Sequence, residues 1–180
     1  MTAITMEWKD RLSAFWQERK PLVKRRLPAY VITGLAIYTF TRFYACAYVD
    51  SPSIHGTMVW ITLEQPTIES LHRGELVFLK YAGRTLESHQ PGDNWVKYVR
   101  GLPGDRVEVK NRVVYVNGEL IGKAKNQTRH GTPLEPTTSG VIPPGHIFIG
   151  GVDPNSFDSR YAAVSLQPIA AVQGRAKVLF

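Results

Sequence analysis

An apolar stretch near the amino-terminal end is the feature that most constrains how this chain can fold. Residues 27–49 (LPAYVITGLAIYTFTRFYACAYV) carry a single charged side chain, Arg42, and directly follow a Lys-Arg-Arg cluster at 24–26. As a helix, this stretch would be about 34 Å long, whereas the hydrocarbon core of a bilayer is roughly 30 Å thick. We therefore predict a transmembrane helix over 27–49, with the basic cluster on the cytoplasmic side and residues 50–180 beyond the membrane.

Two alternatives for this stretch stay open. A charge inside a bilayer is costly, but Arg42 lies seven residues from the outer end, where a long side chain can reach the interface. The stretch could instead be an apolar helix packed on a soluble domain. It could also be a removable signal peptide, because Ala45-Cys46-Ala47 resembles a small-x-small cleavage site. The long polar head of 26 residues favours a retained anchor.

The positive charge of the chain is concentrated in that head. The net charge is +7, and residues 1–26 hold seven basic against three acidic side chains, whereas residues 50–180 hold fourteen against twelve. A nearly balanced larger part argues against a nucleic-acid-binding face. Within the head, Trp8, Leu12 and Phe15 recur at helical spacing, which predicts an amphipathic helix on the cytoplasmic membrane surface or against a neighbouring chain.

From residue 50 onward the pattern is typical of a mainly β domain, since short β-branched runs alternate with Gly and Pro. Residues 106–121 predict a β-meander with turns at Asn111 and Asn117-Gly118. Residues 123–140 are polar and predict a long surface loop. The predicted strands are Glu75–Tyr81, Trp95–Val99, Arg106–Val109, Val113–Val116, His146–Ile149 and Ala176–Phe180.

Three segments of the β part carry candidate catalytic side chains. Ser51-Pro52-Ser53 places two serines around a rigid proline, although alone it is typical of a turn. Lys97 lies on an apolar strand, where it is either an edge lysine that reaches solvent or a desolvated one. Residues 150–161 form an Asx-rich loop in which Asp158 and Arg160 can pair.

Together and in this order, these segments resemble the type I signal peptidases, a family of serine–lysine membrane proteases. The likeness runs roughly from Ser51 to Tyr161. Residues 97–105 (KYVRGLPGD) are similar to the lysine box of the family, 155–161 (NSFDSRY) to its last box and 72–77 (HRGELV) to its Arg-Gly-Asp box. The resemblance implies a signal-peptidase-like antiparallel β domain preceded by a single N-terminal transmembrane helix.

The resemblance also implies a role for individual side chains. A serine nucleophile needs a base, and lysine is a base only when its pKa of about 10.4 falls by roughly two to three units, which desolvation can supply. The implied roles are a nucleophile (Ser53), a general base (Lys97), a hydroxyl donor to the oxyanion (Ser51), a hydroxyl that orients the lysine (Ser156) and structural residues near the site (Asp158 and Arg160).

Two departures from the family pattern indicate a specialised branch. The chain has Ser53-Ile54-His55-Gly56-Thr57 where Ser-Met-x-Pro-Thr is usual, and Gly150-Gly151-Val152 where Gly-Asp-Asn is usual. With a short outer part at 50–180, this looks like the conjugative-transfer peptidases that mature pilin subunits. Hydrolysis and joining of the pilin ends into a ring both stay open.

The predicted organisation is therefore a basic amphipathic head (1–26), a membrane anchor (27–49) and a peptidase domain (50–180) outside the cytoplasm. The resemblance implies a single-pass protein of the bacterial inner membrane, with the lipid bilayer and membrane-inserted precursor proteins as partners. These precursors would be pilin or other proteins with signal peptides and small residues at −1 and −3. No metal or nucleotide motif is present in the sequence, so we expect no cofactor and no nucleic-acid partner. A non-catalytic membrane-anchored pilus assembly factor of the same fold is the alternative. A self-cleaving repressor is disfavoured, because the head has no helix-turn-helix pattern.

Overall fold

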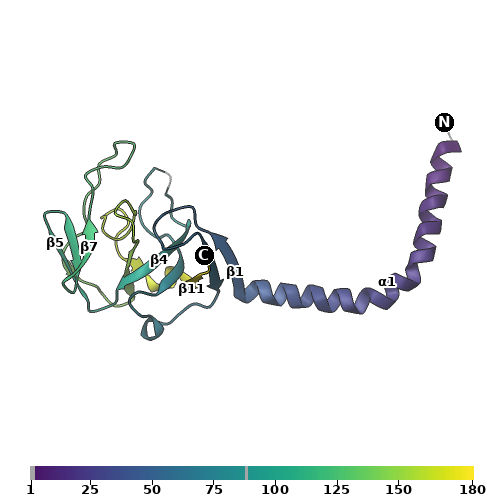
Figure 1. Cartoon of the computed structure of the whole chain (residues 1–180), viewed down its shortest axis with the longest axis horizontal. Coiled ribbons are helices and arrows are strands. Elements are labelled where there is room, and N and C mark those ends of the chain that lie inside the picture. Colours follow the sequence, from purple (N-terminus) through teal and green to yellow (C-terminus); the bar gives the residue numbers. More distant parts are fainter. Residues whose placement is uncertain (1–2, 88) are drawn as a thin grey trace. The chain divides into compact units, whose positions relative to one another are not determined.

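The computed structural model describes residues 3–87 and 89–180. The chain divides into two units, Met1–Arg42 and Phe43–Phe180. Residues 3–42 of the first unit are part of a single helix, α1 (Ala3–Phe43), which continues through Pro21 and Pro28 (Figure 1). Each proline removes one backbone hydrogen bond of the helix. The predicted amphipathic head and most of the predicted anchor therefore lie on one helix.

The end of the predicted anchor is not helical. Residues Tyr44–Tyr48 form strand β1, which pairs antiparallel with β2 (Met58–Thr62). In β1 the half-buried Ala45 and Ala47 alternate with exposed neighbours, which is the period of a strand at a sheet surface. The prediction of helix up to residue 49 is wrong for this segment. Within residues 3–87 and 89–180, no helix combines the length and the apolar character that a bilayer crossing requires.

The second unit contains two antiparallel sheets among its described residues, which confirms the predicted mainly β fold. The larger has the strand order β1-β2-β11-β3-β4-β9-β10 and the smaller the order β7-β6-β5-β8. Figure 1 labels β1, β4 and β11 of the larger sheet and β5 and β7 of the smaller. Two short 3-10 helices lie at Ile68–Ser70 and Ile169–Ala171. The remaining strands are β3 (Leu76–Lys80), β4 (Asn94–Gly101), β5 (Arg106–Lys110), β6 (Val113–Val116), β7 (Glu119–Lys123), β8 (Gly140–Val141), β9 (His146–Gly150), β10 (Gln167–Pro168) and β11 (Val172–Val178).

The predicted meander is confirmed as β5, β6 and β7 of the smaller sheet. Asn111 and Asn117 occupy the turns with positive φ, a conformation that asparagine tolerates better than most residues. The predicted strand at 176–180 begins earlier, at Val172, and ends at Val178. Phe148 of β9 packs on the smaller sheet, so a strand of the larger sheet completes the core of its neighbour.

The long loop predicted at 123–140 is only partly a surface loop. Most of its residues are exposed, but Ala124 and Leu134 are 1% and 5% exposed and belong to the main core. That core is centred on β3, β4 and β9, through Val77, Val99 and Ile149. Burial of Leu134 fixes the loop to the body of the unit and brings residues 125–130 to the groove described below.

Candidate active site

Lys97 lies in the middle of β4, where strand alternation turns it into the protein. Trp95, Lys97 and Val99 are the buried members of the alternating pattern, and Lys97 pairs in register with Val77 of β3. An inward lysine on a central strand is largely shielded from solvent, so its amine needs protein partners. The alternation of buried and half-buried side chains along β4 is therefore what positions this amine.

Ser53 and Ser156 reach the same place from turns far apart in the chain. Ser53 lies in the turn after β1, held from one side by the buried Ile54 and from the other by a hydrogen bond from the Val152 N–H to the Ser53 carbonyl, 2.9 Å. Ser156 lies in the loop that follows β9. The two side chains and Lys97 are 4%, 4% and 7% exposed, respectively.

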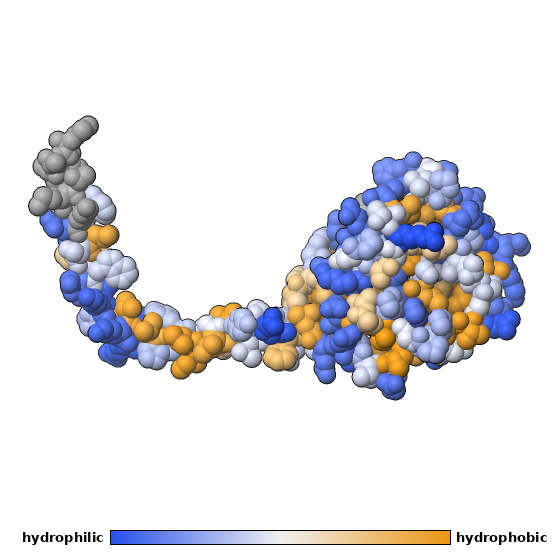
Figure 2. All heavy atoms as spheres, turned by 180° about the vertical axis from the view of Figure 1, so that it is seen from behind, coloured by the Kyte–Doolittle hydropathy of each residue, from blue (hydrophilic) through white to orange (hydrophobic). Residues whose placement is uncertain are grey.

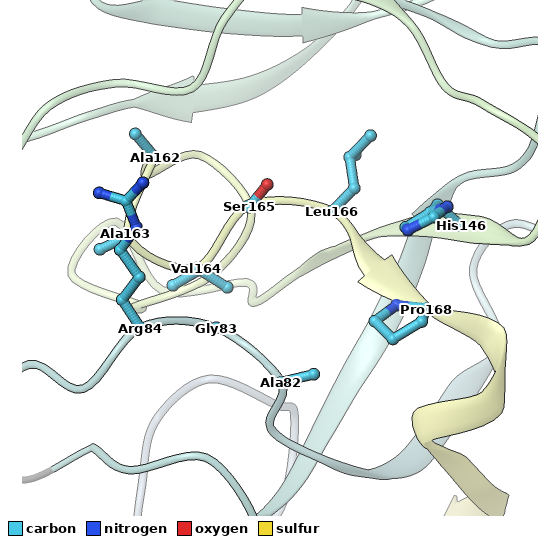
Figure 3. Close-up of a pocket in the computed structure, with 10 residues that line it drawn as sticks. All are labelled: Ala82, Gly83, Arg84, His146, Ala162, Ala163, Val164, Ser165, Leu166 and Pro168. Atoms are coloured by element: carbon cyan, nitrogen blue, oxygen red, sulfur yellow. The ribbon is translucent and has the colours of Figure 1, made fainter.

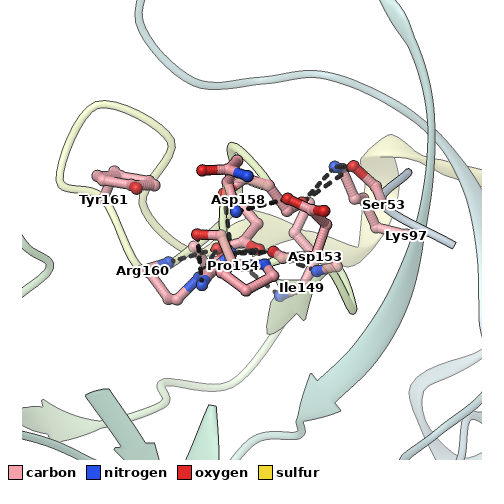
Figure 4. Close-up of polar contacts among 12 residues, drawn as sticks. Ser53, Lys97, Ile149, Asp153, Pro154, Asp158, Arg160 and Tyr161 are labelled. Atoms are coloured by element: carbon pink, nitrogen blue, oxygen red, sulfur yellow. Dashed lines mark hydrogen bonds and ion pairs between the residues drawn. The ribbon is translucent and has the colours of Figure 1, made fainter. Parts of the chain in front are cut away.

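The three side chains form a closed triangle of hydrogen bonds. The Lys97 Nζ lies 2.7 Å from the Ser53 Oγ and 2.9 Å from the Ser156 Oγ, and the Ser156 hydroxyl donates to the Ser53 Oγ over 3.0 Å (Figure 4). If the amine is neutral, the Ser53 hydroxyl can donate to it across the same 2.7 Å. This is the geometry that a serine nucleophile and its base require.

Burial lowers the pKa of Lys97 from 10.5 to about 8. The charge of Asp158 raises this pKa and the charge of Arg160 lowers it, but desolvation is the larger effect. The amine also lies 5.4 Å from the centre of the Trp95 ring. A substantial fraction of Lys97 is thus neutral slightly above neutral pH, as a general base must be.

The loop that carries Ser156 is held by a buried ion pair between Asp158 and Arg160 (Figure 4). The Arg160 Nε donates to the Asp158 Oδ1 over 2.8 Å, and the Arg160 Nη2 donates to the Ser156 carbonyl over 2.9 Å. Asp158 Oδ2 also accepts the Gly151 N–H at 2.9 Å. The pair contacts both ends of the loop from behind the triangle and does not touch the Lys97 amine.

Ser51 is not part of the triangle. It is exposed, two residues before Ser53, and lines the same groove. The groove has a volume of about 970 Å³ and includes Ser53, Lys97 and Ser156 in its lining. A second hollow of about 420 Å³, lined by Arg84, His146 and residues 162–166 among others, contains none of the predicted site residues (Figure 3).

An aromatic cluster beside the triangle of Ser53, Lys97 and Ser156 was not predicted as part of the site. The His89 ring stacks on Phe157 at 5.0 Å and meets Trp95 edge-on at 5.3 Å, and all three residues line the groove. Burial, followed by the charge of Lys97, lowers the pKa of His89. Only the apolar character of Trp95 and Phe157 was visible in the sequence, because the cluster joins segments that lie far apart in the chain.

Gly56 explains one departure from the family pattern. Its φ of +135° is closed to proline, whose ring fixes φ near about −65°. A Cβ at this position would lie 2.5 Å from the Phe180 carbonyl oxygen, which accepts the Thr57 N–H at 2.8 Å. The turn after Ser53 therefore packs against the end of the chain in a way that requires glycine.

Gly151 marks the second departure and leads to a prediction. A Cβ there would lie 2.1 Å from the Ser156 Oγ and 3.1 Å from the Ser53 Cβ. Gly151→Ala should displace the Ser156 hydroxyl and lower kcat by about 100-fold, since a shift near 1 Å is enough for such a loss. Steady-state kinetics with a precursor peptide would measure it. Gly140→Ala is the matched control, because nothing lies within 4 Å of its Cβ, and equal kcat values for both variants would contradict the prediction.

Comparisons with known proteins agree on one family. The model of the signal peptidase family, peptidase S26, matches residues 19–180. The chain is 36% identical over 67 residues to the conjugal transfer protein TraF of Agrobacterium fabrum, with 37% of this chain and 38% of that protein covered. It is 30% identical over 161 residues to a signal peptidase I of Bacillus amyloliquefaciens, with 84% of this chain and 78% of the relative covered.

Two further comparisons complete these findings. A signal peptidase I of Pseudomonas aeruginosa is 32% identical over 116 residues, which cover 49% of this chain and 39% of that protein. The crystal structure of a signal peptidase I from Enterococcus faecalis aligns with a TM-score of 0.38 and 22% identity, over 61% of this chain and 98% of that one. The chain thus spans 38% of the length of the TraF relative and 39% of the Pseudomonas one. Because the family model extends over the whole second unit and the Bacillus relative aligns with most of the chain, the chain belongs to the signal peptidase family, peptidase S26.

Proposed function

We propose that this protein is a serine endopeptidase that removes signal or leader peptides, with Ser53 as nucleophile and Lys97 as general base. The observation that carries the proposal is the buried contact of 2.7 Å between the Lys97 Nζ and the Ser53 Oγ. The pKa of Lys97, lowered to about 8 by burial, supports the same roles. Family membership supports peptidase chemistry in general.

The geometry supports a complete proton path. Ser53 Oγ attacks the carbonyl carbon of the scissile peptide bond and passes its proton to the neutral Lys97 amine, and a tetrahedral intermediate forms. The Ser53 N–H and the Ser51 hydroxyl are the proposed donors to its oxyanion. The Lys97 ammonium then gives the proton to the leaving amine, and an acyl-enzyme ester remains. Water, activated by the same lysine, hydrolyses the ester and restores the Ser53 hydroxyl; an amine as acceptor would form a new peptide bond instead.

Ser156 is proposed to orient the lysine. Its hydroxyl lies 2.9 Å from the Lys97 Nζ, so it limits the rotation of a side chain that otherwise has four flexible bonds. The ion pair of Asp158 and Arg160 is proposed to be structural, because it holds the Ser156 loop without touching the amine. Both assignments agree with the roles that the sequence resemblance implies.

Attachment to the bacterial inner membrane is proposed through α1, with the catalytic unit outside the cytoplasm. Beyond the basic cluster at 24–26, the helix presents apolar side chains that are at least half exposed, such as Ile32 (66%) and Leu35 (60%). Figure 2 shows hydrophobic spheres along this helix. Such a surface needs an apolar partner, and lipid next to a basic cluster is the partner this pattern favours. Membrane-inserted precursors would then be the substrates that reach Ser53.

The proposed substrates are pilin precursors or other precursors of conjugative transfer. The relatives named conjugal transfer protein TraF support this branch. The departures at Gly56 and Gly151 support a specialised relative, because they change the turns that carry both serine hydroxyls.

The test is cleavage of a pilin precursor and of an ordinary secretory preprotein by the detergent-solubilised full chain. We expect wild type to process the pilin precursor in preference, and Ser53→Ala and Lys97→Ala each to lose at least about 1,000-fold in kcat. Lys177→Ala, an exposed lysine on β11, is the control that should keep wild-type activity. Undiminished processing by both site variants would refute the roles of Ser53 and Lys97. No processing by any of the four proteins would favour a non-catalytic pilus assembly factor.

A further inference from the structure

The loop between β7 and β8 forms one wall of the groove that holds the dyad. Besides the buried Leu134, five consecutive or nearly consecutive residues of this loop line the groove: Lys125, Gln127, Thr128, Arg129 and His130. They come from the segment that the sequence indicates to be a plain surface excursion. The loop therefore lines the groove but has no role in the proposed catalytic steps.

Three contacts hold this loop at the groove. The Lys125 Nζ donates to the Asn155 Oδ1, and the Thr128 hydroxyl donates to the Glu87 Oε1. The Lys125 N–H also donates to the Tyr161 hydroxyl at 3.3 Å. Asn155 is adjacent to Ser156, so the loop is tied directly to the segment that carries the catalytic triangle. Its position relative to Ser53 is thereby defined by side-chain contacts on two sides.

The tip of the loop is an ordered turn. The Thr128 N–H donates to the Thr132 carbonyl at 2.9 Å, and the Thr128 Oγ1 accepts the His130 N–H at 3.2 Å. Gly131 supplies the positive φ, +88°, that closes the turn. Arg129 and His130 are at the apex with exposed side chains, at the rim of the groove.

Among the described residues, Arg129 has no carboxylate partner at this rim, whereas the exposed His130 lies within electrostatic range of Glu87. No ion pair joins Arg129 to any carboxylate in the described part of the chain. Glu87, which also lines the groove, is already bonded to the Thr128 hydroxyl. The other acidic lining residues, Asp50 and Asp153, belong to the segments that carry Ser53 and Ser156. A free guanidinium beside Lys125 at the edge of a groove attracts an anionic group and can bind it in a bidentate manner.

We propose, on the basis of the peptidase function proposed above, that Arg129 and His130 form a subsite for an acidic side chain of the substrate. An extended peptide bound at Ser53 would pass this wall with one or two side chains, and Asp or Glu at that position would complete the missing ion pair. The subsite adds a charge requirement to the small residues that the family resemblance implies at −1 and −3. It selects among precursors and takes no part in bond cleavage.

The experiment scans charge along quenched fluorescent peptides that keep Ala at −1 and −3 and carry Ala, Asp or Lys at one position at a time. With the detergent-solubilised full chain, Asp at one or two adjacent positions should raise kcat/KM about five-fold over Lys, mainly through KM, and high salt should weaken this preference. Arg129→Glu should reverse the order, with Lys preferred at the same position. Arg84→Glu, at the separate hollow, is the matched control and should keep the wild-type preference (Figure 3).

Binding without cleavage separates this inference from the function on which it rests. The same peptides bound to the Ser53→Ala variant, followed by fluorescence anisotropy, should show the same charge order in Kd. Cleavage or binding with no preference for Asp, or a preference unchanged in Arg129→Glu, would overturn the subsite while the peptidase function stands. Peptide binding with the charge preference but without cleavage by wild type would support the subsite and count against the peptidase. If the peptides are neither bound nor cleaved, both the subsite and the peptidase function are overturned.

Discussion

Replacing Lys97 with methionine is expected to abolish substrate cleavage and to raise the free energy of unfolding at neutral pH. Lowering the pKa of Lys97 from 10.5 to about 8 corresponds to roughly 3 kcal/mol of unfavourable free energy for the charged form in the folded protein. Methionine has a similar length and no charge. The two serine hydroxyls left behind still bond to each other, at 3.0 Å in the native site. After the loss of two hydrogen bonds to the amine, we expect a net gain of about 1–2 kcal/mol.

The pH dependence of the free energy of unfolding distinguishes removal of the desolvated Lys97 charge from better packing of methionine. The folded-state pKa of about 8 lies below the unfolded value of 10.5, so between these pH values the unfolded chain binds more protons than the folded one. Wild-type stability should therefore rise as the pH increases from 8 to 10.5, and the advantage of Lys97→Met should shrink over the same range. Urea unfolding at a series of pH values measures this. Lys177→Met, at an exposed lysine, should show no such trend, and a pH-independent advantage of Lys97→Met would contradict the explanation.

The Lys97 amine should also determine the pH dependence of wild-type activity. Because only the neutral amine accepts the Ser53 proton, log kcat/KM should rise with a slope of one below pH 8 and level off above it. The stability cost and the catalytic competence of Lys97 thus have one physical origin, the removal of its amine from water. A plateau that extends well below pH 7 would indicate a different base.

Prediction from the sequence succeeded where local periodicity determines structure. The meander at 106–121 follows from alternation within its strands and from turn residues such as Asn117. The pattern around Lys97 left an edge lysine and a desolvated one open, and the structure shows the buried alternative. Prediction failed at 44–48, because a short apolar run fits a helix and a strand equally well, and pairing with β2 decides between them. Tertiary partners override local preference in such cases.

The site depends on contacts between distant segments, which no local pattern encodes. Ser53 and Ser156 meet across 103 residues of sequence, and their roles were implied by family resemblance and not by spacing. Local patterns also do not encode the close approach of Gly151 to the Ser156 hydroxyl. The same holds for the attachment of the 125–130 loop to Asn155. The residue types indicated the candidate chemistry, whereas only the fold places these side chains in contact.

Breaking the ion pair between Asp158 and Arg160 should cause the largest loss of stability among single substitutions near the site. Both side chains are at most 1% exposed, so removal of one partner leaves the other charge buried and unpaired. We expect Asp158→Asn and Arg160→Met each to lower the free energy of unfolding by about 3–5 kcal/mol. The exposed pair of Arg106 and Glu108 is the matched control, and Arg106→Met should cost less than about 1 kcal/mol in urea unfolding.

The two variants should differ in the direction of their catalytic effect, although both are destabilised. The charge of Arg160 lowers the pKa of Lys97 and that of Asp158 raises it. In the folded fraction, Arg160→Met should therefore move the acid limb of the kcat/KM profile to higher pH, and Asp158→Asn should move it to lower pH. A general loss of site geometry would lower kcat in both variants without opposite shifts. Opposite shifts would therefore mean that the ion pair contributes to the electrostatic environment of Lys97 as well as holding the Ser156 loop, whereas shifts in one direction would limit it to the structural role.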